Sequence, residues 1–459
     1  MDNTSAFFAA FYEQLYQVFG ANQDNTTYVQ LGWPGIQLSP ADFKLPTEPT
    51  GAYDAASAQE TLSWLANIAP VSNALRFQNS GYEIDDLYQI LLFGAMPVDH
   101  NTATVKLFND AQYEFSIAQK GSNREPSMLY YPSLATPVDW YTETNAQNWT
   151  QFSMSSSQVP TPDNNARFFK YGGKELLDKG AFKLAPENTT ESELKTQLFA
   201  DVAKINNDYK RTFNRPNLTT PVTRPAELML NTSMTRLLPT SLHTQPLRQP
   251  RLNTLLPSLV SNPNLRTNFT TSASALNNKV LAPSVLTSKL AKPADYQLDT
   301  QTLEIKTAKP ITLNKKLLLK DILLERLPTR PIEPATTGLS VSFQYCKVLI
   351  NRFWYKNALL NMPNWYMTST ERGFYSSGSL ADITKLFPLL PQAFIAIRNL
   401  RVSANWSNQD RANLSRAQSL GPFSLQGGSM AGNTLSAPGL QIIAWVSRLN
   451  TVYPPQPAP

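Results

Sequence analysis

Ser429 stands in the residue pattern that comes closest to a catalytic motif in this sequence. Residues 427–431, GGSMA, approach the G-x-S-x-G turn, which presents a nucleophilic serine between a buried strand and a helix. The fifth residue of the pattern is alanine instead of glycine. Gly432 and Pro438 then interrupt any helix that could follow. We therefore predict that Ser429 lies in a loop between two strands and is not a nucleophile.

The scarcity of histidine and cysteine argues against several other kinds of chemistry. The chain has two histidines, His100 and His243, and one cysteine, Cys346. A serine triad needs a histidine as its base, and a zinc site needs histidines and cysteines at close spacing. The sequence also contains no glycine-rich loop of the kinds that bind nucleotides. We predict no catalytic residue, no cofactor and no metal site.

Carboxylates are the remaining candidates for chemistry, because a glycosidase needs two of them and no histidine. Nothing in the spacing of the acids in predicted loops selects a pair. Asp85 and Asp86 could bind a cation, but acids in the first turn of a helix also interact favourably with its dipole, and we favour that role. The loop acids are Asp99, Asp139, Glu143, Asp163, Asp382 and Asp410.

The composition favours a protein that packs against other proteins. Charged residues make up 16% of the 459 residues, below the roughly 25% typical of soluble domains. Charge normally maintains solubility, so a surface of neutral polar groups suits an assembled state. The eight tryptophans could line a sugar site, but their place in hydrophobic runs favours core packing. No secretory signal or apolar run of ~18 residues is present, so we expect synthesis in the cytoplasm and no membrane span.

Hydrophobic periodicity predicts that residues 1–214 form a mainly helical domain. Apolar residues recur at spacings of three and four in several segments, as on one face of a helix. Turn-forming residues such as Pro34, Gly35 and Pro40 predict irregular structure between the first helices. The expected helices cover residues 3–19, 55–67, 85–93, 102–118 and 190–213.

Residues 215–295 are rich in proline, threonine and asparagine and predict an extended basic arm. Between residues 210 and 289 there are ten Lys or Arg and one acid, a net charge of +9. The charges are spread singly among few aromatic residues, which disfavours nucleic acid as the partner. Leucines followed by proline suggest anchors for other protein surfaces, although the composition also fits a disordered linker. The predicted interaction residues are Arg224, Arg236, Leu238, Arg248, Arg251, Leu256 and Arg266.

Residues 296–459 predict an antiparallel β-sandwich. Branched and aromatic residues dominate short runs that are separated by Pro, Gly and Asn turns. The clearest runs are residues 339–355, 391–406 and 440–450. The expected fold class is therefore α+β, with a helical N-terminal region, an extended arm and a C-terminal sandwich.

Several segments at the two ends of the chain resemble a group of poorly characterised bacterial proteins. They include WPGIQLSPADFK (33–44), VSFQYCKVLINRFWY (341–355) and SAPGLQIIAWVS (436–447). The shared motifs are structural, so the resemblance carries over no site residue. The composition adds the hypothesis of a link to phage-tail-like particles.

The leading hypothesis is a non-catalytic structural or interaction protein that self-assembles or packs into a larger particle. Its partners would be further copies of the chain or other subunits of the particle. Two alternatives come from other classes. One is a delivered hydrolase acting on glycan or lipid, and the other is a lectin-like module with an exposed aromatic platform.

Overall fold

Helices and antiparallel sheets both occur along the chain in the computed structural model, so the α+β class is confirmed in its coarse form. The predicted helix 190–213 and the predicted arm 215–295 lie outside the described residues. Within the described part, no helix is long and apolar enough to cross a membrane. The structure describes residues 3–20, 26–99, 102–124, 128–142, 145–158, 165–178, 180–185, 297–298, 305–306, 324–325, 327–368 and 370–458.

The predicted helices of the first 120 residues are confirmed, each to within two residues. They are α1 (Asn3–Phe19), α2 (Ala55–Ala66), α3 (Ile84–Gly94) and α4 (Thr102–Ile117). Further short helices lie between the strands. They are η2 (Pro40–Phe43), η3 (Ala146–Asn148), η4 (Ser156–Gln158), α5 (Arg167–Lys170), α6 (Gly173–Asp178), α14 (Asn357–Leu360) and α15 (Asn408–Leu414).

A nine-stranded sheet forms the centre of the molecule, and two long antiparallel strands are its spine. These are β14 (Thr337–Asn351) and β17 (Leu389–Asn405). On the far side of β17 lie β22 (Gln441–Leu449) and β21 (Thr434–Ala437), and on the far side of β14 lie β8 (Leu134–Thr136) and β9 (Thr150–Ser155). The sheet ends in β1 (Thr27–Gln37) and β3 (Arg76–Phe77) beyond β22, and in β20 (Ser429–Ala431) beyond β21.

The spine changes its partners at Asn399. Residues 389–397 of β17 pair with β22, and residues 400–403 pair with β21. Asn399 between them has φ 56°, in the left-handed region that asparagine tolerates better than most residues. The facing strand β14 has a register shift between Ser342 and Gln344. A bulge at this position bends the two spine strands, so that β17 can pair with β22 before it and with β21 after it.

The strand β1 differs from the irregular structure that was predicted around Pro34 and Gly35. β1 pairs antiparallel with β22 on both sides of these residues, and the register shifts between Leu31 and Ile36. Proline and glycine are tolerated in a strand where a bulge interrupts the ladder. Pro34 and Gly35 therefore coincide with an irregularity inside β1, and they do not end the strand.

The pairing of β1 with β22 also changes the predicted domain organisation. Strands from the predicted helical domain 1–214 lie in one sheet with strands from the predicted sandwich 296–459. α1 packs into a hydrophobic core that contains residues of β14, β17 and β22. The physical reason is that alternating apolar residues indicate a strand but do not indicate which strand lies beside it.

A smaller sheet of four antiparallel strands covers part of the central sheet. Its residues Phe182, Leu420 and Phe423 lie in the same core as α1. The strands are β13 (Thr329–Arg330), β10 (Phe182–Leu184), β18 (Ala417–Leu420) and β19 (Phe423–Ser424). The remaining strands form two-stranded pairs: β2 (Ile68–Pro70) with β4 (Asn79–Glu83), β5 (Met96–Pro97) with β15 (Trp365–Tyr366), β6 (Lys120–Gly121) with β7 (Leu129–Tyr130), β11 (Gln297–Leu298) with β12 (Ile305–Lys306), and β16 (Ser376–Ser377) with β23 (Val452–Tyr453).

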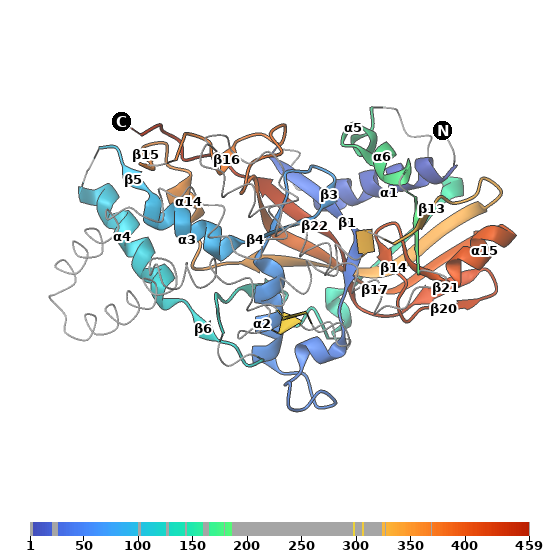
Figure 1. The fold of residues 1–459 in the computed structure, drawn as a ribbon. Coiled ribbons are helices and arrows are strands. Elements are labelled where there is room, and N and C mark those ends of the chain that lie inside the picture. The colour runs from blue at the N-terminus through green and yellow to red at the C-terminus, as the bar shows by residue number, and fades with distance from the viewer. Residues whose placement is uncertain are drawn as a thin grey trace.

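The central sheet is covered on both faces. Ile395 and Ile397 of β17 point into the core that contains α1, and the alternate residues Phe394 and Ala396 point into a core that contains α2. A third core surrounds α3 and α4. Figure 1 shows α1, α5 and α6 together on one side of the long strands, with α2 on the other side and α3 and α4 towards one end.

We predict that Phe11→Ala destabilises the whole molecule by about 3–5 kcal/mol, the usual cost of truncating a buried phenylalanine. Phe11 is 0% exposed, and its ring contacts Phe152, Phe343 and Phe423 from three different strands. Urea denaturation with an unchanged m-value would measure the loss. The matched control is Val18→Ala on the same helix, where the side chain is 50% exposed and the expected change is about 0.5 kcal/mol or less. Equal midpoints for the two variants would contradict this account of the core.

Candidate functional site

The predicted interaction residues all fall outside the described part of the chain. They are Arg224, Arg236, Leu238, Arg248, Arg251, Leu256 and Arg266, and the same holds for His100, Glu143, Asp163 and His243. Their roles stay predictions. The candidate groups that can be placed are Ser429, the other loop acids, the acids at the start of α3 and the polar groups that the fold buries.

Ser429 begins strand β20, which pairs with β21 as a hairpin. The prediction of a plain loop is therefore wrong at this point, because Ala431 and Thr434 pair directly and leave a two-residue turn at Gly432 and Asn433. Gly432 has φ 59°, which glycine adopts without strain in such turns. Ser429 is exposed on this hairpin, and a strand follows it where a nucleophile elbow would need a helix.

Of the predicted loop acids that can be placed, Asp139 and Asp382 accept hydrogen bonds from nearby residues, and Asp99 accepts one from a distant segment. Asp139 accepts hydrogen bonds from the side-chain amides of Asn145 (2.7 Å) and Asn148 (2.8 Å). These bonds favour the charged form and lower the pKa of Asp139 below its ordinary value. Asp382 accepts from the Thr384 hydroxyl at 2.6 Å, and that bond likewise lowers its pKa. Asp99 accepts from Asn364 at 3.3 Å.

Asp410 was predicted to lie in a loop, but it lies in the first turn of the short helix α15 and is buried. Its Oδ2 accepts from the backbone N–H of Glu333 (3.0 Å) and from the hydroxyl of Thr336 (2.5 Å). These bonds tie the segment before β14 to the short helix α15, at whose start Ser407 accepts from the Asp410 N–H. Asp410 therefore fixes the approach of one spine strand to the end of the other.

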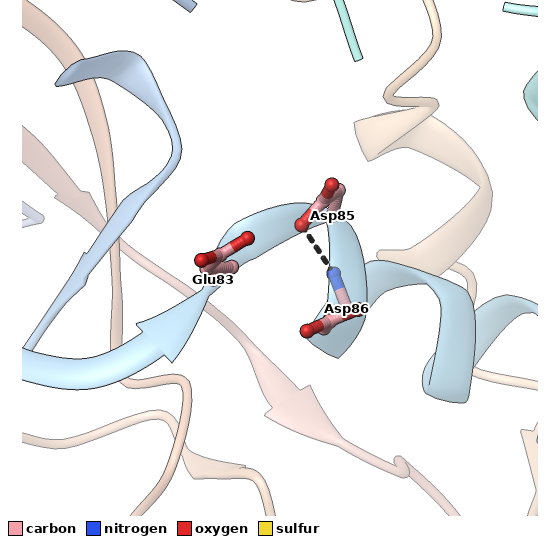
Figure 2. A group of neighbouring side chains, drawn as sticks. All are labelled: Glu83, Asp85 and Asp86. Atoms are coloured by element: carbon pink, nitrogen blue, oxygen red, sulfur yellow. Dashed lines mark hydrogen bonds between the residues drawn. The ribbon is translucent and has the colours of Figure 1, made fainter. Parts of the chain in front are cut away.

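Three acids, Glu83, Asp85 and Asp86, converge at the start of α3 (Figure 2). Oxygens of Glu83, Asp85 and Asp86 lie within 4.8 Å of one another. Such oxygens suit Ca²⁺ or Mg²⁺. The side chain of Asp85 is buried and accepts from the Asp86 N–H (2.7 Å) and from the Asn67 amide (2.9 Å).

The contacts of this acid group are those of a helix start. Asn67 follows the C-terminus of α2, and its Oδ1 accepts from the Asp85 N–H at 2.9 Å. The backbone N–H of Ile84 donates to the Asn67 carbonyl at 2.8 Å. Negative side chains are favourable at a helix N-terminus, where free N–H groups point outward. The favoured prediction for Asp85 and Asp86, a role at the start of a helix, agrees with these contacts.

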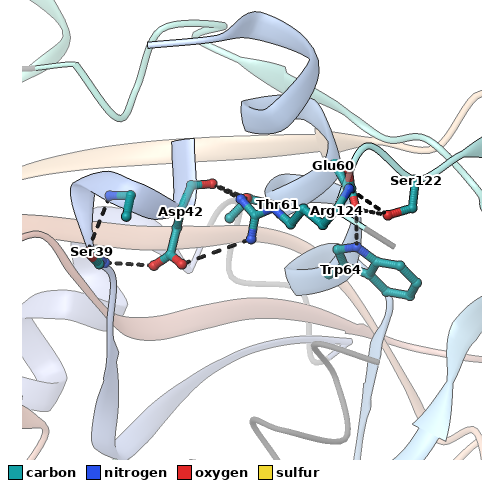
Figure 3. A network of polar contacts seen from close by, with 8 residues as sticks. Ser39, Asp42, Glu60, Thr61, Trp64, Ser122 and Arg124 are labelled. Carbon is teal, nitrogen blue, oxygen red and sulfur yellow. Dashed lines mark hydrogen bonds and ion pairs between the residues drawn. The ribbon is translucent and has the colours of Figure 1, made fainter. Parts of the chain in front are cut away.

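Glu60 lies at the centre of a buried polar network that the sequence analysis did not identify (Figure 3). Glu60 belongs to α2 and is buried. Its carboxylate accepts from the Trp64 indole N–H (3.3 Å), from the Ser122 hydroxyl and from the Asn123 N–H (2.9 Å). The position of Glu60 among the apolar residues of this helix could have indicated such a network. A buried carboxylate requires several hydrogen-bond donors.

Arg124 extends this network to the short helix η2. Its guanidinium donates to the Asp42 carbonyl and to the Thr61 hydroxyl, and it lies 4.0 Å from the Asp42 carboxylate. Thr61 also donates to the Asp42 carbonyl. The network thus joins η2, α2 and the loop 122–124 over the face of the sheet that carries the α2 core, and its geometry is that of a structural clamp.

We predict that Glu60→Ala destabilises the fold by about 3 kcal/mol, because two buried donors, on Trp64 and Ser122, and the Asn123 N–H lose their acceptor. Glu60→Gln keeps one acceptor oxygen and should cost clearly less. Urea midpoints would measure both effects. Glu48→Ala, an acid exposed on the loop after η2, is the matched control and should change stability by about 0.5 kcal/mol or less. If Glu60→Ala behaves like the control, the network does not stabilise this region.

Arg352 is a buried cation at the end of β14. Its guanidinium donates to the Pro391 carbonyl at 2.7 Å and to the Ala66 carbonyl at the C-terminus of α2. Burial lowers its pKa to about 10, so it stays charged at neutral pH. The last carbonyls of a helix carry partial negative charge and suit a cation. Arg352 therefore joins α2 to both spine strands.

The tryptophans and the cysteine belong to the cores. All eight tryptophans are buried, as predicted. Cys346 is buried in β14, and burial raises the pKa of its thiol to about 11. The thiol is therefore protonated at neutral pH, and the thiolate is the nucleophilic form.

Two exposed leucines lie in the ladder between β8 and β14. We call Leu134 and Leu349 the edge patch; they are 44% and 48% exposed. Leu134 and Leu349 alternate with Ala135 and Val348, which point into the α2 core, so they lie on the opposite face.

The edge patch begins where α1 stops covering this face of the sheet. Two residues before Leu349, Lys347 reaches the carbonyl of Phe19, the last residue of α1, at 3.5 Å. Phe19 in turn packs its ring on Tyr345 of the same strand. Leu349 is the next residue of β14 on that face, beyond the end of the helix.

No family model matches the sequence, and neither the characterised proteins nor the solved structures that were compared with it gave a significant match. The sequence and the structure of this chain are therefore the basis for its proposed function.

Proposed function

We propose that the protein is a non-catalytic assembly subunit that packs against further copies of itself within a larger particle. The observation that carries the proposal is the edge patch, because an isolated protein normally covers apolar side chains that lie together. The low charge content of 16% supports it, since few charges oppose the approach of a second copy. A phage-tail-like particle is the kind that we favour, and synthesis in the cytoplasm followed by release in such a particle is part of the same proposal.

The buried polar groups support a structural role in the same way. Glu60, Arg352 and Asp410 each hold two or more segments together through hydrogen bonds. A hydrolase would be favoured by a pair of carboxylates in an aromatic-lined cleft, and a lectin-like module by an exposed aromatic platform. All eight tryptophans are buried, which argues against a platform built of tryptophan.

The proposal also assigns roles to the two sheets and to residues 215–295. We propose that the smaller sheet and the central sheet act as a sandwich-like body, and that residues 215–295 are an arm which reaches from it to neighbouring subunits. The leucines that are followed by proline in this arm would each contribute roughly 1.5–3 kcal/mol of binding free energy when they are fully covered. That contribution is enough to hold subunits together.

We predict that the purified protein elutes above its monomer mass of 51.2 kDa in size-exclusion chromatography with light scattering. The double variant Leu134→Lys and Leu349→Lys should weaken assembly by about tenfold or more, because two leucines lose their cover. Ile383→Lys, at another exposed apolar residue, is the matched control and should assemble normally. A monomeric wild-type protein at every accessible concentration would contradict the proposed function.

The arm gives a separate prediction. Replacing residues 230–290 with a Gly/Ser linker of the same length should lower the assembled mass while the thermal transition and circular dichroism spectrum of the body remain. The reason is that the arm is proposed to contact neighbouring subunits and not the core. Normal assembly of this variant would remove the arm from the proposal, and electron microscopy of both proteins would show whether filaments or rings depend on it.

A further inference from the structure

The outer edge of β9 is open in the described part of the chain. β9 pairs with β14 through residues 150–155 on one side, and it has no partner strand on the other. Its outward backbone N–H and C=O groups can therefore hydrogen-bond to an added strand. β8 lies further along the same side of β14, so the open edge and the edge patch lie on the same side of this strand.

β9 lacks the features that normally protect an edge strand. Lysine, proline, glycine and bulges prevent edge-to-edge pairing in natural sheets. Residues 145–158, NAQNWTQFSMSSSQ, contain no charged residue, no proline and no glycine. The pairing of β9 with β14 is regular over residues 150–155, so no bulge turns this edge away.

The side chains on the outward face of β9, and those of β14 that stand opposite them, are uncharged. Ser153 and Ser155 of β9 stand opposite Ser342 and Ser340 of β14, and Gln151 stands opposite Gln344. The alternate residues Phe152 and Met154 are buried in the core that contains α1. A strand that approaches this edge meets apolar residues on one face and neutral polar residues on the other.

We propose that β9 pairs antiparallel with β9 of a second copy, so that the central sheets of two subunits continue into one another. This inference rests on the proposed function and names its partner and its mode of contact. The strand is self-complementary: a twofold axis perpendicular to the sheet and through Ser153 places Phe152 opposite the Met154 of the second copy. Apolar residues then meet apolar residues, and Ser153 meets its own copy.

A pair of charge variants tests this register. Ser153 is exposed, so Ser153→Lys and Ser153→Glu should both fold. Each variant alone places like charges directly opposite one another, and its association constant should fall by about tenfold. An equimolar mixture of the two should recover association, because opposite charges then face each other. Ser153→Thr, which keeps the residue neutral, should associate like the wild type.

A cysteine variant provides a second and independent measurement. Directly opposed residues of an antiparallel pair are close enough for a disulfide, so Ser153→Cys should form a covalent dimer under mild oxidation. Asn408→Cys, exposed on α15, is the control and should not.

The outcomes separate this inference from the proposed function. A wild-type protein that assembles, with Lys and Glu variants that assemble equally well and no disulfide at position 153, would overturn the β9 pairing and leave the proposed function standing. A wild-type protein that stays monomeric would overturn both. Loss of assembly in each single variant, recovery in the mixture and a dimer at position 153 would establish the contact.

Discussion

The pairing of β17 with its neighbours is the interaction on which the rest of the structure depends. Residues 389–397 pair with β22 and residues 400–403 with β21, while the opposite edge pairs with β14 along most of its length. Both faces of the strand are buried under different elements. A one-residue shift would exchange the two sets of side chains, so the register is fixed from both sides.

The buried polar groups act on the same frame. Arg352 connects β14, β17 and the end of α2, and Asp410 connects the segment before β14 with the helix after β17. Glu60 attaches the loop 122–124 to α2. Each satisfies buried donors or acceptors that would otherwise destabilise the fold. Arg352, Asp410 and Glu60 are residue types that are often catalytic, but in this protein each one hydrogen-bonds to other segments of the chain.

The border of the sheet differs from this well-covered centre. β1 and β22 close one part of the sheet by joining the early and late segments of the chain. Along the outer side of β14, by contrast, β9 has no second partner strand among the described residues, and the edge patch leaves apolar side chains exposed. Hydrogen-bonding capacity and apolar surface at one border are the two components of a contact between sheets, which is why assembly is the function that these observations favour.

The sequence by itself determined the elements whose pattern is local. The apolar stripe of residues 3–19 and the runs at 339–355, 391–406 and 440–450 correspond to α1, β14, β17 and β22, because 3.6-residue and two-residue periods follow from backbone geometry. The sequence also indicated that the tryptophans are buried and that Ser429 lacks a following helix. Only the tertiary structure decided that β1 joins β22, that Glu60 and Arg352 meet their donors and acceptors, and that β9 lies at an edge. Those contacts join residues 60 to more than 400 positions apart, and a local pattern carries no information about a partner at that distance.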